Sequence, residues 1–239
     1  KKSEIASDDE NAGIWRRIAE TKLQMLDDED GATKAYERAL ELDPESTVTV
    51  DALISLYEPR DAAERLVELY SRRVELAGSA DADLRYDLNV RAADRFEKSL
   101  NNRREAISSL NAALDARPAD ATVLGSLERL YRAEQMWDEL LDNLKLQAAN
   151  AGTKEDRVKL RTAIGDLYAD QLASPQDALE HYRLVLDDDA TNDHAIKAIR
   201  TIGEGREELR LDSADALEPV LRAASRWEEL VGVLEMRLK

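Results

Sequence analysis

The sequence predicts an all-α fold, a solenoid built from pairs of antiparallel helices. Three observations lead to this prediction. Aromatic residues make up only 5% of the 239 residues, and the chain holds nine Gly and five Pro. Ala, Leu, Glu, Arg and Asp, which favour helices over strands, are abundant. The third observation is an internal repeat of about seventy-three residues, which is typical of stacked helical units.

Three windows of equal length align without a gap, from Ala19 to Pro44, from Ala93 to Pro118 and from Gly165 to Ala190. Their apolar and small anchors recur at the same steps: Ala19, Ala93, Gly165; Leu26, Leu100, Leu172; Ala32, Ala106, Ala178; Tyr36, Leu110, Tyr182; Ala39, Ala113, Val185; Leu40, Leu114, Leu186. Ala32, Tyr36, Ala39 and Leu40 are spaced as i, i+4, i+7 and i+8, so they share one helix face. The small residue of each window lets a second helix approach closely.

A second kind of segment alternates with these windows and begins at Tyr57, Tyr131 and Leu221. Each long repeat therefore contains two hairpins. Six hairpins account for the chain as one solenoid over residues 1–239, at about 8–44, 46–78, 81–117, 120–151, 154–188 and 192–238. The chain begins without Met and stops within a predicted helix, so we expect an excerpt of a longer protein.

Helix starts and stops agree with these hairpins. Thr153 with Asp156, and Ser174 with Pro175, read as helix starts. Pro44 and Pro118 follow helix ends.

The last unit is longer than the others. Trp137 and Trp227 lie 90 residues apart, which requires an insertion, and the segment Gly203–Asp215 supplies it. Gly203 and Gly205 would close one helix, and Asp212 or Ser213 would cap an inserted helical segment. Pro219 is expected to kink that helix.

The anchors resemble those of the tetratricopeptide repeat family, in a divergent, bacterial-type array. Trp15, Ile18 and Ala19 are similar to the family's Trp-x-x-Leu-Gly start, and Gly165 and Tyr168 to its Gly-x-x-Tyr. The gap from the small residue to the following Ala is thirteen, one more than usual, which implies an extra residue in the turn between helices. A related two-helix repeat of the half-a-tetratricopeptide kind is the alternative.

The resemblance implies a right-handed α-solenoid whose first helices line a concave, protein-binding groove. Chaperone-binding members clamp a terminal carboxylate with a Lys-x-x-x-Asn pattern on these helices. Here Arg16 stands at a matching Lys position, whereas Glu20, Asp94 and Asp166 stand at the matching Asn positions. We therefore expect no such clamp. Arg16, Glu20, Asp94 and Asp166 instead form a candidate partner-binding surface that would attract a Lys- or Arg-rich segment.

Charge argues against other partners. The net charge of −17 repels nucleic acid and anionic lipid, and no apolar run is long enough to span a bilayer. The chain has no Cys, which leaves the compartment open, with the cytoplasm as the default.

Catalytic chemistry is not predicted either. His181 and His194 are thirteen residues apart across a predicted turn, and the acidic runs Asp27–Asp30 and Asp187–Asp189 lack the spacing of a calcium loop. We expect a protein that is not an enzyme and needs no metal or cofactor. Trp15, Trp137 and Trp227 are expected in the core, with partner contact as the second interpretation.

Two functions are consistent with these patterns. One is a scaffold that binds another protein or a peptide on its concave surface. The other is a structural spacer within a longer helical-repeat protein.

Overall fold

Helices are the one kind of regular secondary structure in the residues that the structure describes. The structure is a computed structural model that describes residues 8–79 and 81–238. Thirteen α-helices and two 3₁₀ turns lie within those residues and no strand is found among them. They are α1 (Asp8–Leu26), α2 (Glu29–Leu42), α3 (Thr47–Tyr57), η1 (Glu58–Arg60), α4 (Ala63–Ala77), α5 (Ala82–Lys98), α6 (Arg103–Ala116), α7 (Ala121–Glu134), α8 (Trp137–Ala149), α9 (Lys154–Asp170), α10 (Pro175–Asp188), α11 (Asp193–Gly205), η2 (Glu207–Leu209), α12 (Arg210–Ala223) and α13 (Trp227–Met236).

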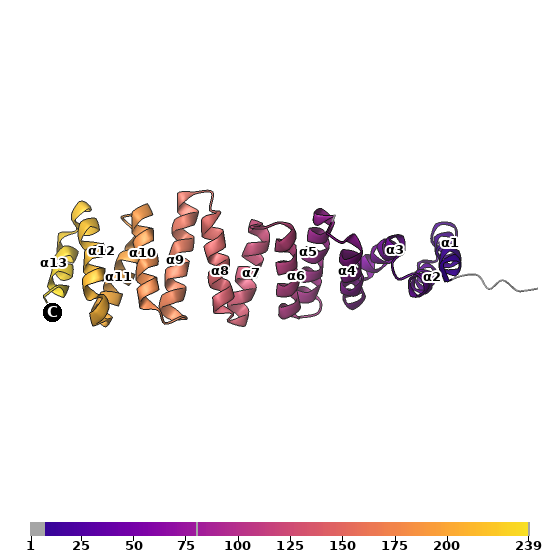
Figure 1. The fold of residues 1–239 in the computed structure, drawn as a ribbon, viewed down its shortest axis with the longest axis horizontal. Coiled ribbons are helices and arrows are strands. Elements are labelled where there is room, and N and C mark those ends of the chain that lie inside the picture. The colour runs from indigo at the N-terminus through magenta and orange to yellow at the C-terminus, as the bar shows by residue number, and fades with distance from the viewer. Residues whose placement is uncertain (1–7, 80, 239) are drawn as a thin grey trace, which may run out of the picture. The chain divides into compact units, whose positions relative to one another are not determined.

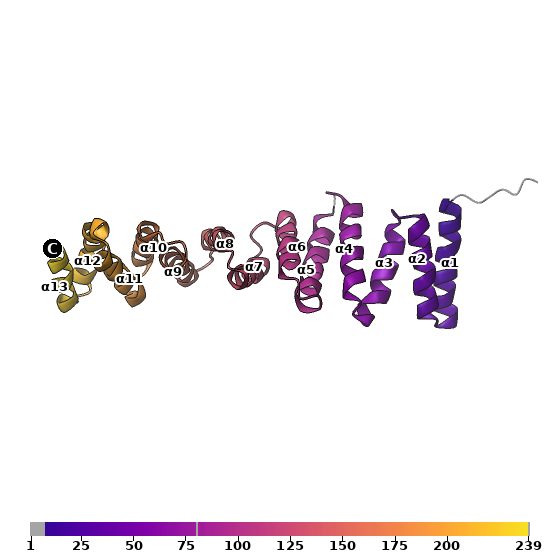
Figure 2. The same cartoon turned by 90° about the horizontal axis from the view of Figure 1, so that it is seen from below.

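These helices form two compact units, residues 1–123 and 124–239, whose boundary lies inside α7. Within each unit, helices pack mainly against their neighbours in sequence, which Figures 1 and 2 show from two sides. The prediction of an all-α chain of sequential helix pairs is confirmed. The single domain and the handedness of the array stay predictions.

Unit 1 has a continuous core between α1 and α5. Ala19 from α1, Tyr36 and Leu40 from α2, Leu53 from α3 and Leu66 from α4 all contribute buried side chains. Each of these helices is amphipathic, so burial of the apolar stripe stabilises the pair far more than helix propensity does.

The predicted close contacts between paired helices are present. Ala32, Ala106 and Ala178 are all fully buried, at 0% exposure. α1 packs on α2, α5 on α6 and α9 on α10. A larger side chain at any of the three positions would push the paired helices apart.

The turns repeat as regularly as the helices. Asp27, Asn101 and Ala173 have φ values of 52°, 50° and 51°, in the left-handed region. In each case the next residue donates its backbone N–H to the carbonyl six residues earlier, from Asp28 to Lys22, from Asn102 to Phe96 and from Ser174 to Tyr168. This left-handed residue lies in the turn where the sequence predicts one extra residue.

The other type of turn also has one geometry. Asp61, Gln135 and Ser225 have φ values of 49°, 56° and 56° and precede α4, α8 and α13. These turns share their backbone conformation although their side chains differ. The repeat predicted from the apolar anchors is therefore visible in the backbone as well.

Unit 2 ends in three helices, α11, α12 and α13, where earlier repeats have two. In the repeat alignment, the start of α11 corresponds to the start of α7, and the end of α12 corresponds to the end of α7. The insertion therefore lies between the start of α11 and the end of α12, as predicted.

The predicted cap of the inserted helix is wrong. α12 begins at Arg210, and Ser213 is a fully buried residue of its first turns. A Cβ added to Gly203 in α11 would lie 2.7 Å from Ser213 Cβ, so the two helices approach each other at this point. The Ser213 side chain therefore packs against α11 and does not cap α12. α12 continues through Pro219 to Ala223.

Candidate protein-binding surfaces

The three acidic residues predicted to bind a partner follow the small residues of α1, α5 and α9. Ala19, Ala93 and Gly165 are buried, whereas the next residue in each helix reaches solvent. Consecutive side chains of a helix point about 100° apart. A residue buried between the two helices of a hairpin is therefore followed by a residue at the edge of their contact. Local geometry thus places Glu20, Asp94 and Asp166 at comparable positions of their helices.

The contacts made by these residues differ. In unit 1, Arg16 donates to Asp43 Oδ2 at 2.8 Å and to Ser46 Oγ at 2.9 Å, which ties α1 to the end of α2 and the start of α3. Asp94 pairs with Lys98 Nζ at 2.5 Å, one helical turn away. Arg16 and Asp94 therefore carry charges that are matched within the unit.

Asp166 in unit 2 joins three helices. Tyr182 of α10 donates its hydroxyl hydrogen to Asp166 Oδ1 at 2.6 Å, and Nε2 of His194 in α11 lies 2.7 Å from the same oxygen. Burial, and then this carboxylate, raise the pKa of the Tyr182 hydroxyl, so it stays a donor. Gly165 is required beside it, because a Cβ there would lie 2.7 Å from the Tyr182 ring.

His181, the neighbour of Tyr182 in α10, also contacts α9. It is half-buried and stacks on Tyr168, with ring centroids 5.5 Å apart. Burial lowers the pKa of the His181 ring, which favours its neutral form. The structure therefore shows a packing role for His181 on the helix face.

The tryptophans are less buried than predicted. Trp137 is half-buried, but Trp15 is 37% and Trp227 is 58% exposed. The expectation of a core position is wrong for Trp15 and for Trp227. The counterpart of Trp227, Ala63 at the start of α4, is buried, whereas α13 is the last described helix of unit 2.

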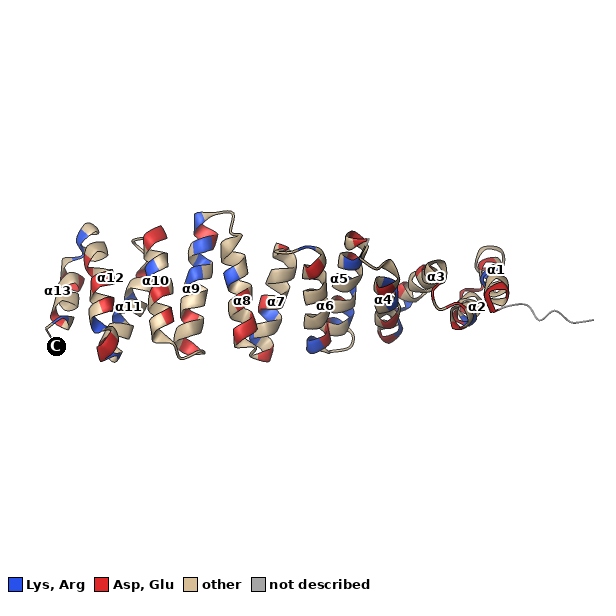
Figure 3. Ribbon diagram, in the orientation of Figure 1, with Lys and Arg blue, Asp and Glu red and all other residues tan. Residues whose placement is uncertain are grey.

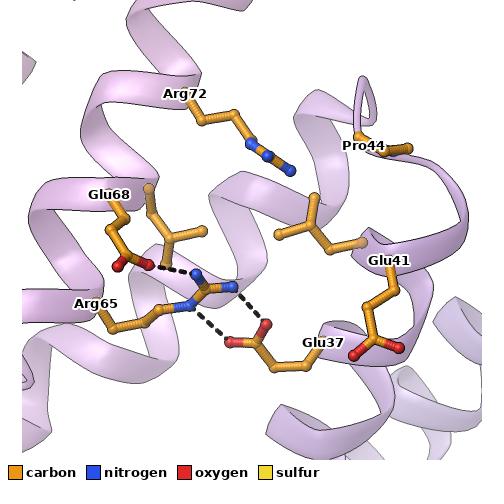
Figure 4. A pocket seen from close by; sticks show the side chains of 8 residues that line it. Glu37, Glu41, Pro44, Arg65, Glu68 and Arg72 are labelled. Atoms are coloured by element: carbon orange, nitrogen blue, oxygen red, sulfur yellow. Dashed lines mark hydrogen bonds and ion pairs between the residues drawn. The ribbon is translucent and has the colours of Figure 1, made fainter.

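The apolar and charged side chains of unit 1 enclose a cleft that the sequence did not predict. It lies between α2 and α4, has a volume of about 440 Å³ and has Leu40 and Leu69 among its lining residues (Figure 4). Arg65 bridges the two helices, with Nε 3.0 Å from Glu37 Oε1 and Nη1 2.6 Å from Glu68 Oε2. This network raises the pKa of the Arg65 guanidinium further, chiefly through Glu37.

Arg72 lies at the same cleft without a partner. Its guanidinium makes no hydrogen bond or ion pair within residues 8–79 and 81–238, and in Figure 4 it extends toward the side where Pro44 lies. The cleft between α2 and α4, the second helices of their hairpins, thus combines the cation of Arg72 with the apolar side chains of Leu40 and Leu69. The family resemblance points to first helices, so this cleft could be found only from the structure.

A second cleft lies in unit 2, between α9 and the turn that joins α7 to α8. Its volume is about 340 Å³, and it is lined by Arg132, Trp137, Ala163, Asp166, Leu167, Asp170 and Gln171. The basic residues of α9 all lie in its N-terminal half, together with Glu155 and Asp156, whereas its C-terminal half carries only the acids Asp166 and Asp170 (Figure 3). The predicted Asp166 and the half-buried Trp137 therefore meet at one place.

Metal and membrane features are also defined by the structure. Among residues 8–79 and 81–238, no group of three or more His, Asp or Glu side chains is placed to hold a metal ion. Within the same ranges, no helix has the length and apolar character needed to cross a bilayer.

Sequence comparison finds no relative, since no family model matches the chain and no curated protein is similar to it. Solved structures do match. MamA protein has 19% sequence identity and a TM-score of 0.40, covering 75% of this chain and 92% of its own. YrrB, a TPR protein with an unusual peptide-binding site, has 18% identity and a TM-score of 0.40, covering 79% of this chain and 92% of its own. The human IFIT1 dimer with PPP-AAAA has 20% identity and a TM-score of 0.44, covering 95% of this chain and 54% of its own.

The structural neighbours of this chain are tetratricopeptide repeat proteins. At these identities the likeness concerns the fold alone. The absence of nucleic acid and membrane from the partners stays a prediction.

Proposed function

We propose that this chain is a non-catalytic scaffold that binds a segment of another protein, and that the segment is basic. The observation that carries the proposal is the repeated acid at the edge of the first helices. Glu20, Asp94 and Asp166 each follow a buried small residue and each reaches solvent. In a chain of net charge −17, such acids attract Lys and Arg side chains and repel acidic ones.

A binding comparison tests this proposal. Fluorescently labelled Lys- and Arg-rich peptides are titrated with the chain beside Asp- and Glu-rich peptides of equal length and hydropathy. We expect the basic peptides to bind saturably, at least about tenfold more tightly, and to lose affinity as salt rises, since exposed charges are screened within about 8 Å at physiological ionic strength. Equal binding, or a preference for acidic peptides, overturns the basic partner.

A matched pair of variants separates these acids from the overall charge. The triple variant Glu20→Gln, Asp94→Asn, Asp166→Asn should weaken binding of the basic peptides. If the triple variant loses no more affinity for the basic peptides than the control variant does, the proposal is contradicted.

The control removes three exposed acids that make no hydrogen bond or ion pair within the described residues. It is Glu45→Gln, Glu64→Gln, Glu180→Gln, which changes the net charge equally. If no peptide of either kind binds saturably, the scaffold proposal falls and the spacer function is favoured.

A further inference from the structure

Both units contain a junction where the second helix of one hairpin meets the first helix of the next. In unit 1 this is α4 against α5, and in unit 2 it is α8 against α9. The repeat relates the two junctions residue by residue. Ala63 corresponds to Trp137, and Arg91, Asp94, Arg95 and Lys98 correspond to Ala163, Asp166, Leu167 and Asp170.

In unit 1 the junction is filled by two guanidinium groups of the chain itself. Arg91 pairs with Glu58 and lies over the Tyr70 ring, 4.9 Å from its centroid. Arg95 Nη1 lies 2.5 Å from Asp61 Oδ1. Two long basic side chains thus cover the turn between α3 and α4.

In unit 2 neither arginine is present. Ala163 and Leu167 stand in their places, and the cleft of about 340 Å³ remains where the guanidinium groups would lie. Trp137 and Leu167 give it an apolar wall, and the cleft is wide enough for a side chain. The two replacements thus leave space at the junction that unit 1 fills with arginine. Arg132 and Gln135 stand where unit 1 has Glu58 and Asp61, so the acids that line this cleft come from α9.

The charge of the cleft matches a cation. Asp170 makes no hydrogen bond or ion pair within the described ranges, and both contacts of Asp166 fall on Oδ1, which leaves Oδ2 without a hydrogen bond there. In unit 1 the equivalent acid, Asp94, is neutralised by Lys98. In unit 2 the residue equivalent to Lys98 is a second acid.

One basic residue, Arg132, also lines the cleft, but it is already paired. Its Nε and Nη2 lie 3.3 Å and 3.1 Å from Glu128 Oε1 on the same helix. Among the lining residues, the two carboxylates Asp166 and Asp170 outnumber the single cation Arg132 by one charge. Glu128, which pairs with Arg132, adds a further negative charge beside the cleft.

We propose that this cleft binds an arginine side chain of a partner protein, with the guanidinium between Asp166 and Asp170 and its stem against Trp137. This rests on the proposed scaffold function and names the residue type that its unit 2 selects. Arginine suits the cleft better than lysine because its planar guanidinium binds carboxylates through two hydrogen bonds and stacks on aromatic rings. Unit 1 fills its own junction with arginine too, although there Glu58 and Asp61 hold the guanidinium groups.

The test uses N-acetylarginine amide as the probe and the full chain labelled with ¹⁵N. The variant Trp15→Phe, Trp227→Phe leaves Trp137 as the single indole, and both replaced residues are solvent-exposed. We expect a saturable shift of the Trp137 indole N–H resonance, with a dissociation constant on the order of 1 mM for so small a ligand. N-acetylcitrulline amide, which has the same shape without the charge, should bind at least about fivefold more weakly.

Two substitutions locate the binding. Asp170→Asn should weaken the arginine probe about fivefold to tenfold, because one of two carboxylates is lost without a native contact being broken. Asp187→Asn, on the exposed face of α10, is the matched control and should leave affinity within about twofold. Ala163→Arg should abolish binding, because it refills the cleft as Arg91 does in unit 1, and its far-UV circular dichroism should stay native.

The proposal is overturned if citrulline and arginine probes bind alike, if neither shifts Trp137, or if Asp170→Asn behaves as Asp187→Asn does. Its failure is distinct from failure of the scaffold function. If basic peptides bind the chain and Ala163→Arg retains that binding, the arginine cleft fails and the scaffold stands. If the probe binds and no peptide does, the scaffold fails and the cleft stands.

Discussion

Truncation of one buried leucine at equivalent steps of the two units should cost the same free energy of unfolding in each. Leu66 in α4 and Leu140 in α8 are both fully buried, at 0% exposure. Leu→Ala removes three carbon atoms, which at about 0.8 kcal/mol each is about 2.4 kcal/mol of transfer free energy. The remaining cavity adds roughly 1–2 kcal/mol, so each variant should lose about 3.5–4.5 kcal/mol. Leu211→Ala is the control, because Leu211 is 59% exposed and its loss should be under about 0.5 kcal/mol.

Urea unfolding followed by ellipticity at 222 nm measures these losses. Repeat proteins can unfold unit by unit, so each curve is fitted for one and for two transitions. Leu66→Ala and Leu140→Ala should agree within about 1 kcal/mol, because the surrounding anchors recur. The repeat would be refuted by a loss at either site that is no larger than the loss in the Leu211→Ala control.

Three further predictions concern packing, pH and capping. Gly203→Ala should destabilise unit 2 because the added Cβ would meet Ser213. Gly205→Ala should be neutral or stabilising by up to about 1 kcal/mol, because nothing lies within 4 Å of its added Cβ. The urea midpoints of the two variants are compared, and equal midpoints would contradict the close approach of α11 and α12. Burial lowers the pKa of His181, so the unfolded chain takes up a proton before the folded chain does, and the stability should fall as pH drops from about 7 toward 5. Thermal melts of His181→Gln should show a smaller loss of stability over the same pH range. An equal loss in the variant would contradict this prediction. Thr153→Ala removes the oxygen that accepts the α9 backbone N–H at 3.0 Å and should cost about 0.5–2 kcal/mol in the same urea assay; no change would show that this cap contributes nothing.

The helices and hairpins could be predicted because their signals are local. Anchors such as Ala32 and Tyr36 repeat at helical spacing, and the turn that follows α1 requires only one residue with positive φ, Asp27. Neither feature depends on distant contacts. The same argument explains the success at the inserted helix, since the spacing from Trp137 to Trp227 is itself a sequence property.

The start of α12 could not be predicted from local signals. Asp212 and Ser213 are good capping residues, yet the close approach to Gly203 buries Ser213 and the helix begins at Arg210. Tertiary packing outweighed capping preference at this position.

The candidate site shows the same division. The sequence could select Asp166 because it repeats in phase with Glu20 and Asp94. Its contacts with Tyr182 and His194, 16 and 28 residues away, depend on how α9, α10 and α11 pack. The cleft beside it arises from residues that are missing relative to unit 1, and that comparison needs the structure of both junctions.

Hydrogen–deuterium exchange with and without a saturating Arg-rich peptide is the most direct test of the account, because it reports every helix at once. The account predicts slower exchange in α9 around Asp166 and Asp170 and in the turn before α8, with α2 and α4 unchanged. Protection confined to the α2 and α4 cleft, or no protection in any helix, would contradict it.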